Sequence, residues 1–198
     1  MNRKNKLHYE LFKFENNIEM KIFIAILSHA TMVYRTNKIN GIQNFSLKGY
    51  LSDDSFLPRK SLTFKKLEKI INDFNSLFFD VLSCEDKQVY FKLSKEYLTT
   101  IANNNGFNKV DLYSLKEITD IRSTKLKILT QLKPSGYFDL NYMIKVLMLN
   151  KVSRRNNKIA KIKNAFDNSG VDFIYKHPNN QNAKVLDEHY KFHYKTIL

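Results

Sequence analysis

Between residues 153 and 168 the chain reads Ser-Arg-Arg-Asn-Asn-Lys-Ile-Ala-Lys-Ile-Lys-Asn-Ala-Phe-Asp-Asn. Ser153 is a residue type that caps helix N-termini, because its hydroxyl accepts a backbone amide of the first turn. Gly170 follows the segment, where a left-handed residue ends helices at little conformational cost. The spacing therefore predicts a short helix with one apolar stripe, made by Ile159, Ile162, Ala165 and Phe166.

The opposite side of this predicted helix is basic and rich in amides, and no acidic residue occurs before Asp167. Such a helix suits a DNA major groove, where Lys and Arg neutralise phosphates and paired donors of Arg or Asn read base edges. The simpler alternative is a solvated surface helix. As the main DNA face we predict Arg154, Arg155, Asn156, Asn157, Lys158 and Lys161.

The whole chain is also basic, with 33 Lys and Arg against 19 Asp and Glu in 198 residues, a formal net charge of +14. A protein with this charge attracts polyanions, meaning nucleic acid or an anionic membrane surface. The hydrophobic fraction of 43% is enough for a packed core. Abundant Lys, Asn and Ile are also typical of an AT-rich genome, which explains part of the lysine excess.

No membrane segment or export signal is expected. The longest apolar run, residues 22–27, is far too short to span a bilayer, and the N-terminus lacks the apolar segment of a signal peptide. Cys84, the single cysteine, excludes an internal disulfide and suits a reducing compartment. We therefore expect a cytoplasmic protein.

The first half predicts a strand over 7–14, a helix from Asn16 or Asn17 to about Tyr34, and a helix from Ser61 to about Asn75. A β-hairpin over 77–83 and 88–93 follows, with Cys84 in its turn. The predicted second DNA contact, whose alternative is a plain solvated helix face, consists of Lys65, Lys66 and Lys69, with Arg59 and Lys60 before them.

The second half predicts a helix opened by Ser114 with Glu117 as its capping box, and stopped by Lys-Pro-Ser-Gly at 133–136. After it come a strand over 137–140, a buried helix over 141–149, the basic helix, a hairpin over 171–175 and 184–186, and an aromatic tail that packs as a strand. A similar order runs from 45 to 93. The sequence thus predicts an α+β, helix-rich chain of two tandem winged helix-turn-helix domains, 1–105 and 106–198.

The segments of the second half resemble the plasmid replication initiators of the Rep_3 family. The similarity lies in 125–129 (Lys-Leu-Lys-Ile-Leu), 136–140 (Gly-Tyr-Phe-Asp-Leu), 144–149 and 159–172, with a vaguer match at 19–23. The resemblance implies two winged-helix domains, binding to direct repeats at a plasmid origin, and initiation of DNA replication with a host initiator and the replicative helicase. It also implies homodimers that repress their own gene.

Signatures of enzymes are missing from the sequence. No phosphate-binding loop of the Gly-x-x-x-x-Gly-Lys type occurs, which argues against an ATPase. His189 and His193 lack an acidic residue between them, so we expect no metal there. His29 lies on an apolar helix stripe and is expected to be a packed histidine. We expect a non-enzymatic protein without a cofactor.

Three other functions fit the same sequence. A transcriptional regulator of the same fold needs no replication role. A basic interaction protein of a phage or mobile element would bind DNA weakly and without a preferred site. A binder of RNA or single-stranded DNA is suggested by 11 Tyr and 15 Phe, but most of these fall on predicted apolar stripes.

Overall fold

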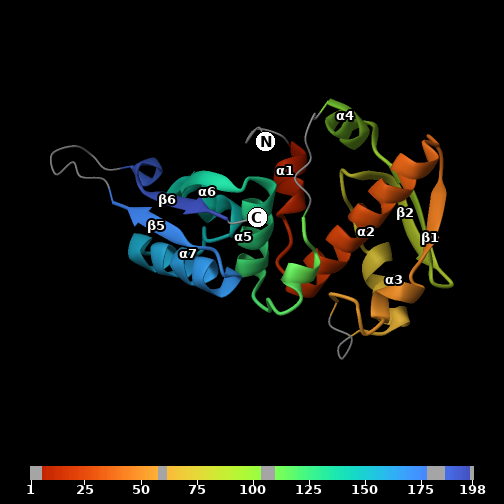
Figure 1. Ribbon diagram of the computed structural model, residues 1–198, viewed down its shortest axis with the longest axis horizontal. Helices are drawn as coiled ribbons and strands as arrows, with labels where there is room; N and C mark the ends of the chain where they lie inside the picture. The colour runs from red at the N-terminus through yellow and green to blue at the C-terminus, as the bar shows by residue number, and fades with distance from the viewer. Residues whose placement is uncertain (1–5, 58–61, 104–109, 178–185, 197–198) are drawn as a thin grey trace. The chain divides into compact units, whose positions relative to one another are not determined.

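The computed structural model describes residues 6–57, 62–103, 110–177 and 186–196 (Figure 1). The chain forms two compact units. The first unit contains residues 2–107 and 112–116, and the second contains 108–111 and 117–198. Each unit carries helices and one three-stranded antiparallel sheet, which confirms the predicted α+β class.

The first unit is built around helix α2, which contributes more buried hydrophobic side chains than any other element of the unit. Its elements are α1 (Lys6–Leu11), α2 (Asn17–Asn37), β1 (Gln43–Ser46), the 3-10 helix η1 (Lys48–Leu51), α3 (Phe64–Asn72), β2 (Phe79–Glu85), β3 (Gln88–Leu93), α4 (Lys95–Asn103) and the 3-10 helix η3 (Tyr113–Leu115). The side chain of Asn16 accepts the amides of Ile18 and Glu19, so the predicted cap is confirmed. On α2, the fully buried ring of Phe23 contacts Phe14, Phe74 and Phe78.

The N-terminal segment is helical, so the predicted strand over 7–14 is wrong. Residues 6–11 form α1, and Leu7, His8 and Phe12 are buried together on one side. The rings of His8 and Phe12 meet edge to face, with 5.1 Å between their centroids. Contacts of this tertiary kind decide the conformation of short apolar segments, in which alternation and helical spacing overlap.

The predicted first hairpin is present, with its turn two residues later than expected. Strands β2 and β3 pair antiparallel from Phe79 opposite Leu93 to Glu85 opposite Gln88. Asp86 and Lys87 form the turn with φ angles of 49° and 62°, the conformation that matches strand twist in two-residue hairpins. Cys84 therefore lies in the strand and is buried, rather than in the turn.

Helix α3 begins later than predicted. Thr63 is its N-cap, and its hydroxyl accepts the amide of Lys66 at 3.2 Å. Ser61, the predicted cap, lies outside the described residues. Ser and Thr side chains can both accept a first-turn amide, so sequence alone does not choose between Ser61 and Thr63 as the N-cap. The choice depends on backbone conformation, which is extended at Thr63.

The second unit has its last strand in the middle of its sheet. Its elements are α5 (Ile121–Leu132), β4 (Ser135–Asp139), α6 (Leu140–Val146), α7 (Arg155–Ser169), β5 (Phe173–Lys176), the 3-10 helix η4 (Asp187–His189) and β6 (Lys191–Lys195). The strand order is β4-β6-β5, and both pairings are antiparallel. The stop signal at 133–136 is confirmed, because α5 ends at Leu132.

Two predictions about this unit are wrong. The strand that pairs with β5 is β6, at 191–195, and not 184–186, of which only Leu186 is described. The aromatic tail supplies this strand because Phe192 and Tyr194 fill the inner face of the sheet. The helix expected from Ser114 starts instead at Ile121, where the side chain of Asp120 accepts the amide of Ser123 at 2.9 Å. Only a 3-10 turn forms at 113–115.

Helix α7 ends as predicted but starts differently. Gly170 has a φ of 63°, and its amide donates to Asp167 while that of Val171 donates to Phe166. These bonds satisfy carbonyls of the last turn. Ser153 is not the N-cap, because that position belongs to Arg154, which makes no side-chain cap bond. The free backbone amides in the first turn of α7 therefore donate no hydrogen bond to the side chain of Ser153 as an N-cap.

The two units share one order of elements. In each, a long helix precedes a short strand, a short helical segment, a second helix and two further strands. The sheet orders β1-β3-β2 and β4-β6-β5 are the same, with the last strand central in both. The repeat predicted from sequence pattern is therefore present as topology, although η1 in the first unit is a 3-10 turn where the second unit has α6.

Replacing Gly170 tests the C-terminal end of α7. The substitution Gly170→Ala should destabilise the protein by about 1 kcal/mol, because a Cβ is strained at positive φ even where space is open. Urea denaturation followed by circular dichroism measures the change. The matched control is Gly49→Ala, where the added Cβ also meets nothing within 4 Å and φ is not positive. Equal stability of the two variants would contradict the assignment.

Candidate nucleic-acid interface

The inner side of α7 is fixed by the core of the second unit. Ile159, Ile162, Ala165 and Phe166 are buried, which confirms the predicted stripe. The ring of Phe166 stacks on Phe173 of β5 at 4.5 Å and faces Phe192 of β6 at 5.9 Å. Helix α7 also packs against α5 (Figure 1). This packing leaves the helix one rotational setting, so the residues on its outer side are determined.

The outer side of α7 carries the predicted DNA face. Arg154, Asn156, Asn157 and Lys161 are exposed, and Lys158 is half-buried. Within the described residues, Arg154, Lys158 and Lys161 form no ion pair with an acid. The charge of these three residues is thus not compensated by a local acid, which favours a polyanionic ligand.

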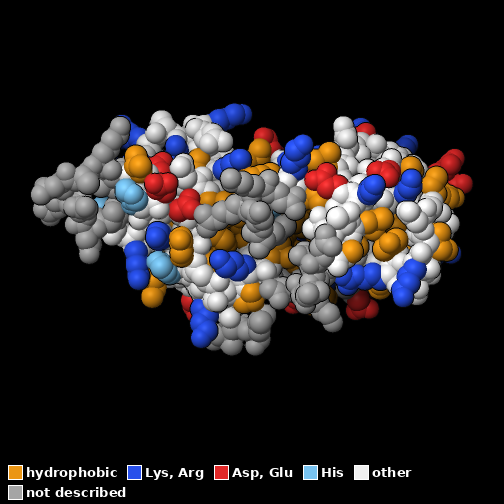
Figure 2. Space-filling view, turned by 90° about the horizontal axis from the view of Figure 1, so that it is seen from above, with side chains coloured by type: hydrophobic (Ala, Val, Ile, Leu, Met, Phe, Trp, Pro, Cys, Tyr) orange, Lys and Arg blue, Asp and Glu red, His pale blue; other side chains and the backbone are white. Residues whose placement is uncertain are grey.

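Basic side chains do not dominate every face of the molecule. On the face that Figure 2 shows, Lys and Arg side chains are interspersed with Asp and Glu. The high net charge therefore does not make every surface a candidate for binding nucleic acid. What distinguishes α7 is a run of cations and amides on a helix whose orientation is fixed by packing.

Arg155 differs from its neighbours because the second unit itself holds its side chain. Its Nε lies 2.7 Å from Oδ1 of Asp187, and Nη1 lies 3.3 Å from the hydroxyl of Tyr190. The guanidinium also lies over the Tyr190 ring, 5.1 Å from the centroid. Sequence reasoning singled out Arg155 but missed both partners, which follow it by more than 30 positions in the chain.

A buried lysine ties α5 to the turn between α6 and α7. Lys125 is only 1% exposed, and its Nζ donates to the carbonyl of Val146, the last residue of α6, at 3.2 Å. A cation at the C-terminal end of a helix is favourable because the terminal carbonyls lack backbone donors. The turn continues through Met148, which has a φ of 57°. Lys125 thus supports the position of α7 from behind.

The second predicted contact lies on α3 of the first unit. Lys65, Lys66 and Lys69 are exposed there, while Arg59 and Lys60 lie outside the described residues. Glu68 accepts the amide of Lys87 at 2.8 Å, and the ammonium of Lys87 lies 4.9 Å from the Phe64 ring centroid. These bonds fix α3 on the β2–β3 hairpin, so its lysines also have a defined direction.

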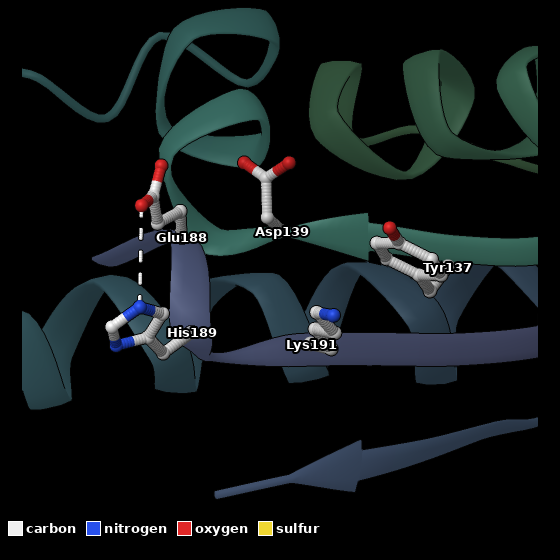
Figure 3. Close-up of a pocket in the computed structure, with 5 residues that line it drawn as sticks. All are labelled: Tyr137, Asp139, Glu188, His189 and Lys191. Carbon is white, nitrogen blue, oxygen red and sulfur yellow. Dashed lines mark ion pairs between the residues drawn. The ribbon is translucent and has the colours of Figure 1, made fainter. Parts of the chain in front are cut away.

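Sequence reasoning did not find the pocket that Figure 3 shows. It has a volume of about 430 Å³ and is lined by Tyr137, Asp139, Glu188, His189 and Lys191. Asp139 accepts the amide of Tyr142 at 2.8 Å and so caps α6, and Lys191 lies over the Tyr137 ring at 4.5 Å. His189 Nε2 is 4.0 Å from Glu188. Because cations and carboxylates are mixed, the pocket favours neither an anion nor a cation.

The remaining histidines have local partners. His29 stacks on Phe45 at 4.0 Å and shares a 3.1 Å hydrogen bond with the Tyr50 hydroxyl, and partial burial lowers the His29 pKa. Burial, followed by Lys176 and Lys191, lowers the pKa of His193. Among the described residues, no group of three or more His, Cys, Asp or Glu is arranged to hold a metal ion.

Cys84 is buried in strand β2. Its backbone amide and carbonyl bond the side chain of Asn72 at 2.7 and 2.9 Å. Burial, with a smaller contribution from Glu68, raises the pKa of the Cys84 thiol to about 11. The thiol is therefore protonated at neutral pH, which makes it a poor nucleophile.

Thiol labelling tests the position of Cys84. At pH 8 the native protein should react with a chromogenic disulfide reagent about 100-fold more slowly than the urea-unfolded protein, because the thiolate fraction falls as the pKa rises from its free value of about 8.5. Labelling is followed by absorbance, and free cysteine in the same buffers is the control. Equal rates in native and unfolded protein would show an accessible thiol.

Comparisons with known proteins identify no relative. No protein-family model matches the chain, and no curated protein matches it. Among the described helices, none has the length and apolar character needed to cross a bilayer.

Proposed function

We propose that this protein is a non-enzymatic, sequence-specific duplex DNA-binding protein, and that α7 enters the major groove. The observation that carries the proposal is the two-sided character of α7. Its apolar side is locked onto the β5–β6 strands by Phe166. Its other side presents Asn156 and Asn157 together with Arg154, Lys158 and Lys161, three cations that form no ion pair among the described residues. A helix held rigidly with such a face can contact phosphates and base edges together.

Each unit, in this proposal, is a winged helix-turn-helix. The order of elements supports this assignment, because α6, the following turn and α7 make the helix-turn-helix, and β5 with β6 makes the wing. The first unit repeats the order with η1, α3 and the β2–β3 hairpin. Lys65, Lys66 and Lys69 on α3 would then make a second contact with the same duplex.

The biological role we propose is that of a plasmid replication initiator. Its support is the resemblance of residues 125–129, 136–140, 144–149 and 159–172 to the Rep_3 initiators. Origin direct repeats would be the DNA partner, with a host initiator and helicase as protein partners and a homodimer as a second state. Maintenance of a plasmid carrying the gene and its flanking DNA tests this role. Specific binding without plasmid maintenance would favour a transcriptional regulator.

Lys161 tests the phosphate contacts of α7. The substitution Lys161→Ala should weaken binding to a preferred duplex and to random duplex by the same factor. It should also reduce the slope of log affinity against log salt by about 0.9, the value for one neutralised phosphate. Fluorescence anisotropy over a salt series measures both. Lys127→Ala on α5, as the control, should leave the slope unchanged. An unchanged slope for Lys161→Ala would remove Lys161 from the interface.

Arg155 is expected to read a base. If it bonds a guanine edge, Arg155→Ala should cost about 1–3 kcal/mol on the preferred duplex and little on random duplex. The control is Arg122→Ala on α5, which also removes an arginine with an acidic neighbour, Asp120 at 3.6 Å. A uniform loss on both duplexes would assign Arg155 to a phosphate instead.

The contact by α3 is tested by replacing its three lysines together. If all three neutralise phosphates, the Lys65/Lys66/Lys69→Ala variant should lower the salt slope by about 2 to 3. Circular dichroism should show an unchanged fold, because these side chains are exposed. A slope equal to that of the wild type would leave α3 as a solvated helix face and α7 as the DNA-contacting helix of the pair.

A further inference from the structure

We propose that Asp187 is a positioning residue that orients Arg155 for base recognition and so sets the specificity of α7. This inference rests on the proposed DNA-binding function. Asp187 lies in η4, on the connection that leads into β6, and outside the predicted DNA face. No pattern in the sequence points to it.

Three contacts together restrict the Arg155 guanidinium. The carboxylate of Asp187 accepts a hydrogen bond from Nε at 2.7 Å, and the hydroxyl of Tyr190 accepts one from Nη1 at 3.3 Å. The guanidinium also lies over the Tyr190 ring, 5.1 Å from its centroid. An arginine side chain otherwise has many rotamers, and fixing them costs binding free energy when it happens only on the DNA. Restriction in the free protein removes most of that cost.

The partners of Arg155 are themselves fixed. Tyr190 is buried, and its carbonyl accepts the amide of Leu140 at 3.0 Å. Its ring lies parallel to that of Tyr175 at 6.3 Å and edge-on to His177 at 5.0 Å. These contacts fix the Arg155 side chain relative to the sheet on which α7 packs, and not only relative to α7 itself.

Stability does not explain the pair. The side chains of Arg155 and Asp187 keep 44% and 27% of their surface exposed, and exposed ion pairs contribute little to folding. A carboxylate beside a DNA-binding helix also repels phosphates, which weakens binding to every sequence. Orientation of Arg155 strengthens binding only where the correct base is present. The repulsion acts on every sequence alike and leaves the ratio of specific to non-specific affinity unchanged, so only the orientation of Arg155 raises that ratio.

Glu188 provides a matched control, because it is the next residue and carries the same charge. Its carboxylate is 4.0 Å from His189 and makes no described contact with Arg155. Asp187→Ala and Glu188→Ala therefore remove equal charge from adjacent positions, but only the first removes an ion pair and hydrogen bond of Arg155. Asp187→Asn keeps an oxygen that accepts from Nε without the charge.

The experiment measures affinity of the full chain for a duplex selected from a random library and for random duplex, by anisotropy at fixed salt. Asp187→Ala should lower the specific-to-random ratio about five- to tenfold relative to Glu188→Ala, and Asp187→Asn should restore part of it. In the Arg155→Ala background, Asp187→Ala should have no further effect on the ratio. Thermal unfolding should be unchanged in all variants.

Two results would overturn the inference while leaving DNA binding intact. Equal ratios for Asp187→Ala and Glu188→Ala would mean that Asp187 acts only through its charge. If Asp187→Ala binds the selected duplex more tightly than Glu188→Ala does, Asp187 competes with DNA for Arg155. If the wild-type protein selects no duplex, the proposed function fails and the inference fails with it.

Discussion

The second unit depends on the insertion of its last strand, β6, between β4 and β5. Because β6 is central, it bonds both neighbours and brings Phe192 against Phe166 of α7. Phe166 of α7 stacks into this aromatic layer, and that contact decides which side of α7 is outward. The cations and amides between Arg154 and Lys161 acquire a direction only through this packing. Charge alone would attract a polyanion, but it would not produce a surface with a defined register on DNA.

The same sheet also controls the first turn of α7. Arg155 bonds Asp187 and Tyr190, which both lie just before the central strand β6, and the ammonium of Lys125 donates to the carbonyl of Val146 at the end of α6. The end of α6, the first turn of α7 and the segment that leads into β6 are therefore connected by polar bonds as well as by apolar packing. This arrangement distinguishes the residues of α7 by role, since Arg155 is held while Arg154 and Lys161 extend without ion pairs among the described residues.

Local signals predicted local structure well. Asn16 and Gly170 fulfil their capping roles, the hairpin at 79–93 follows two β-rich runs, and α5 stops at the Pro-Gly segment. The failures concern choices that depend on distant residues. Ser61, Ser114 and Ser153 are suitable caps, yet the backbone selects Thr63, Asp120 and Arg154. The partner of β5 and the Arg155–Asp187 pair require residues far along the chain, for which periodicity carries no information. The basic face of α7 was predictable because composition and helical spacing coincide there, whereas its use on DNA remains a proposal.

We propose that α7 lies against DNA bases, and site-directed photocrosslinking can detect this placement. Cys84 is buried and burial raises the pKa of its thiol to about 11, so we expect a new surface cysteine to be modified selectively. An aryl azide attached at Asn157→Cys on α7 should crosslink to bases of a selected duplex. The same reagent at Thr119→Cys, an exposed uncharged position before α5, should not. Equal crosslinking from both positions, or crosslinking only from the second, would contradict the placement of α7 in the groove.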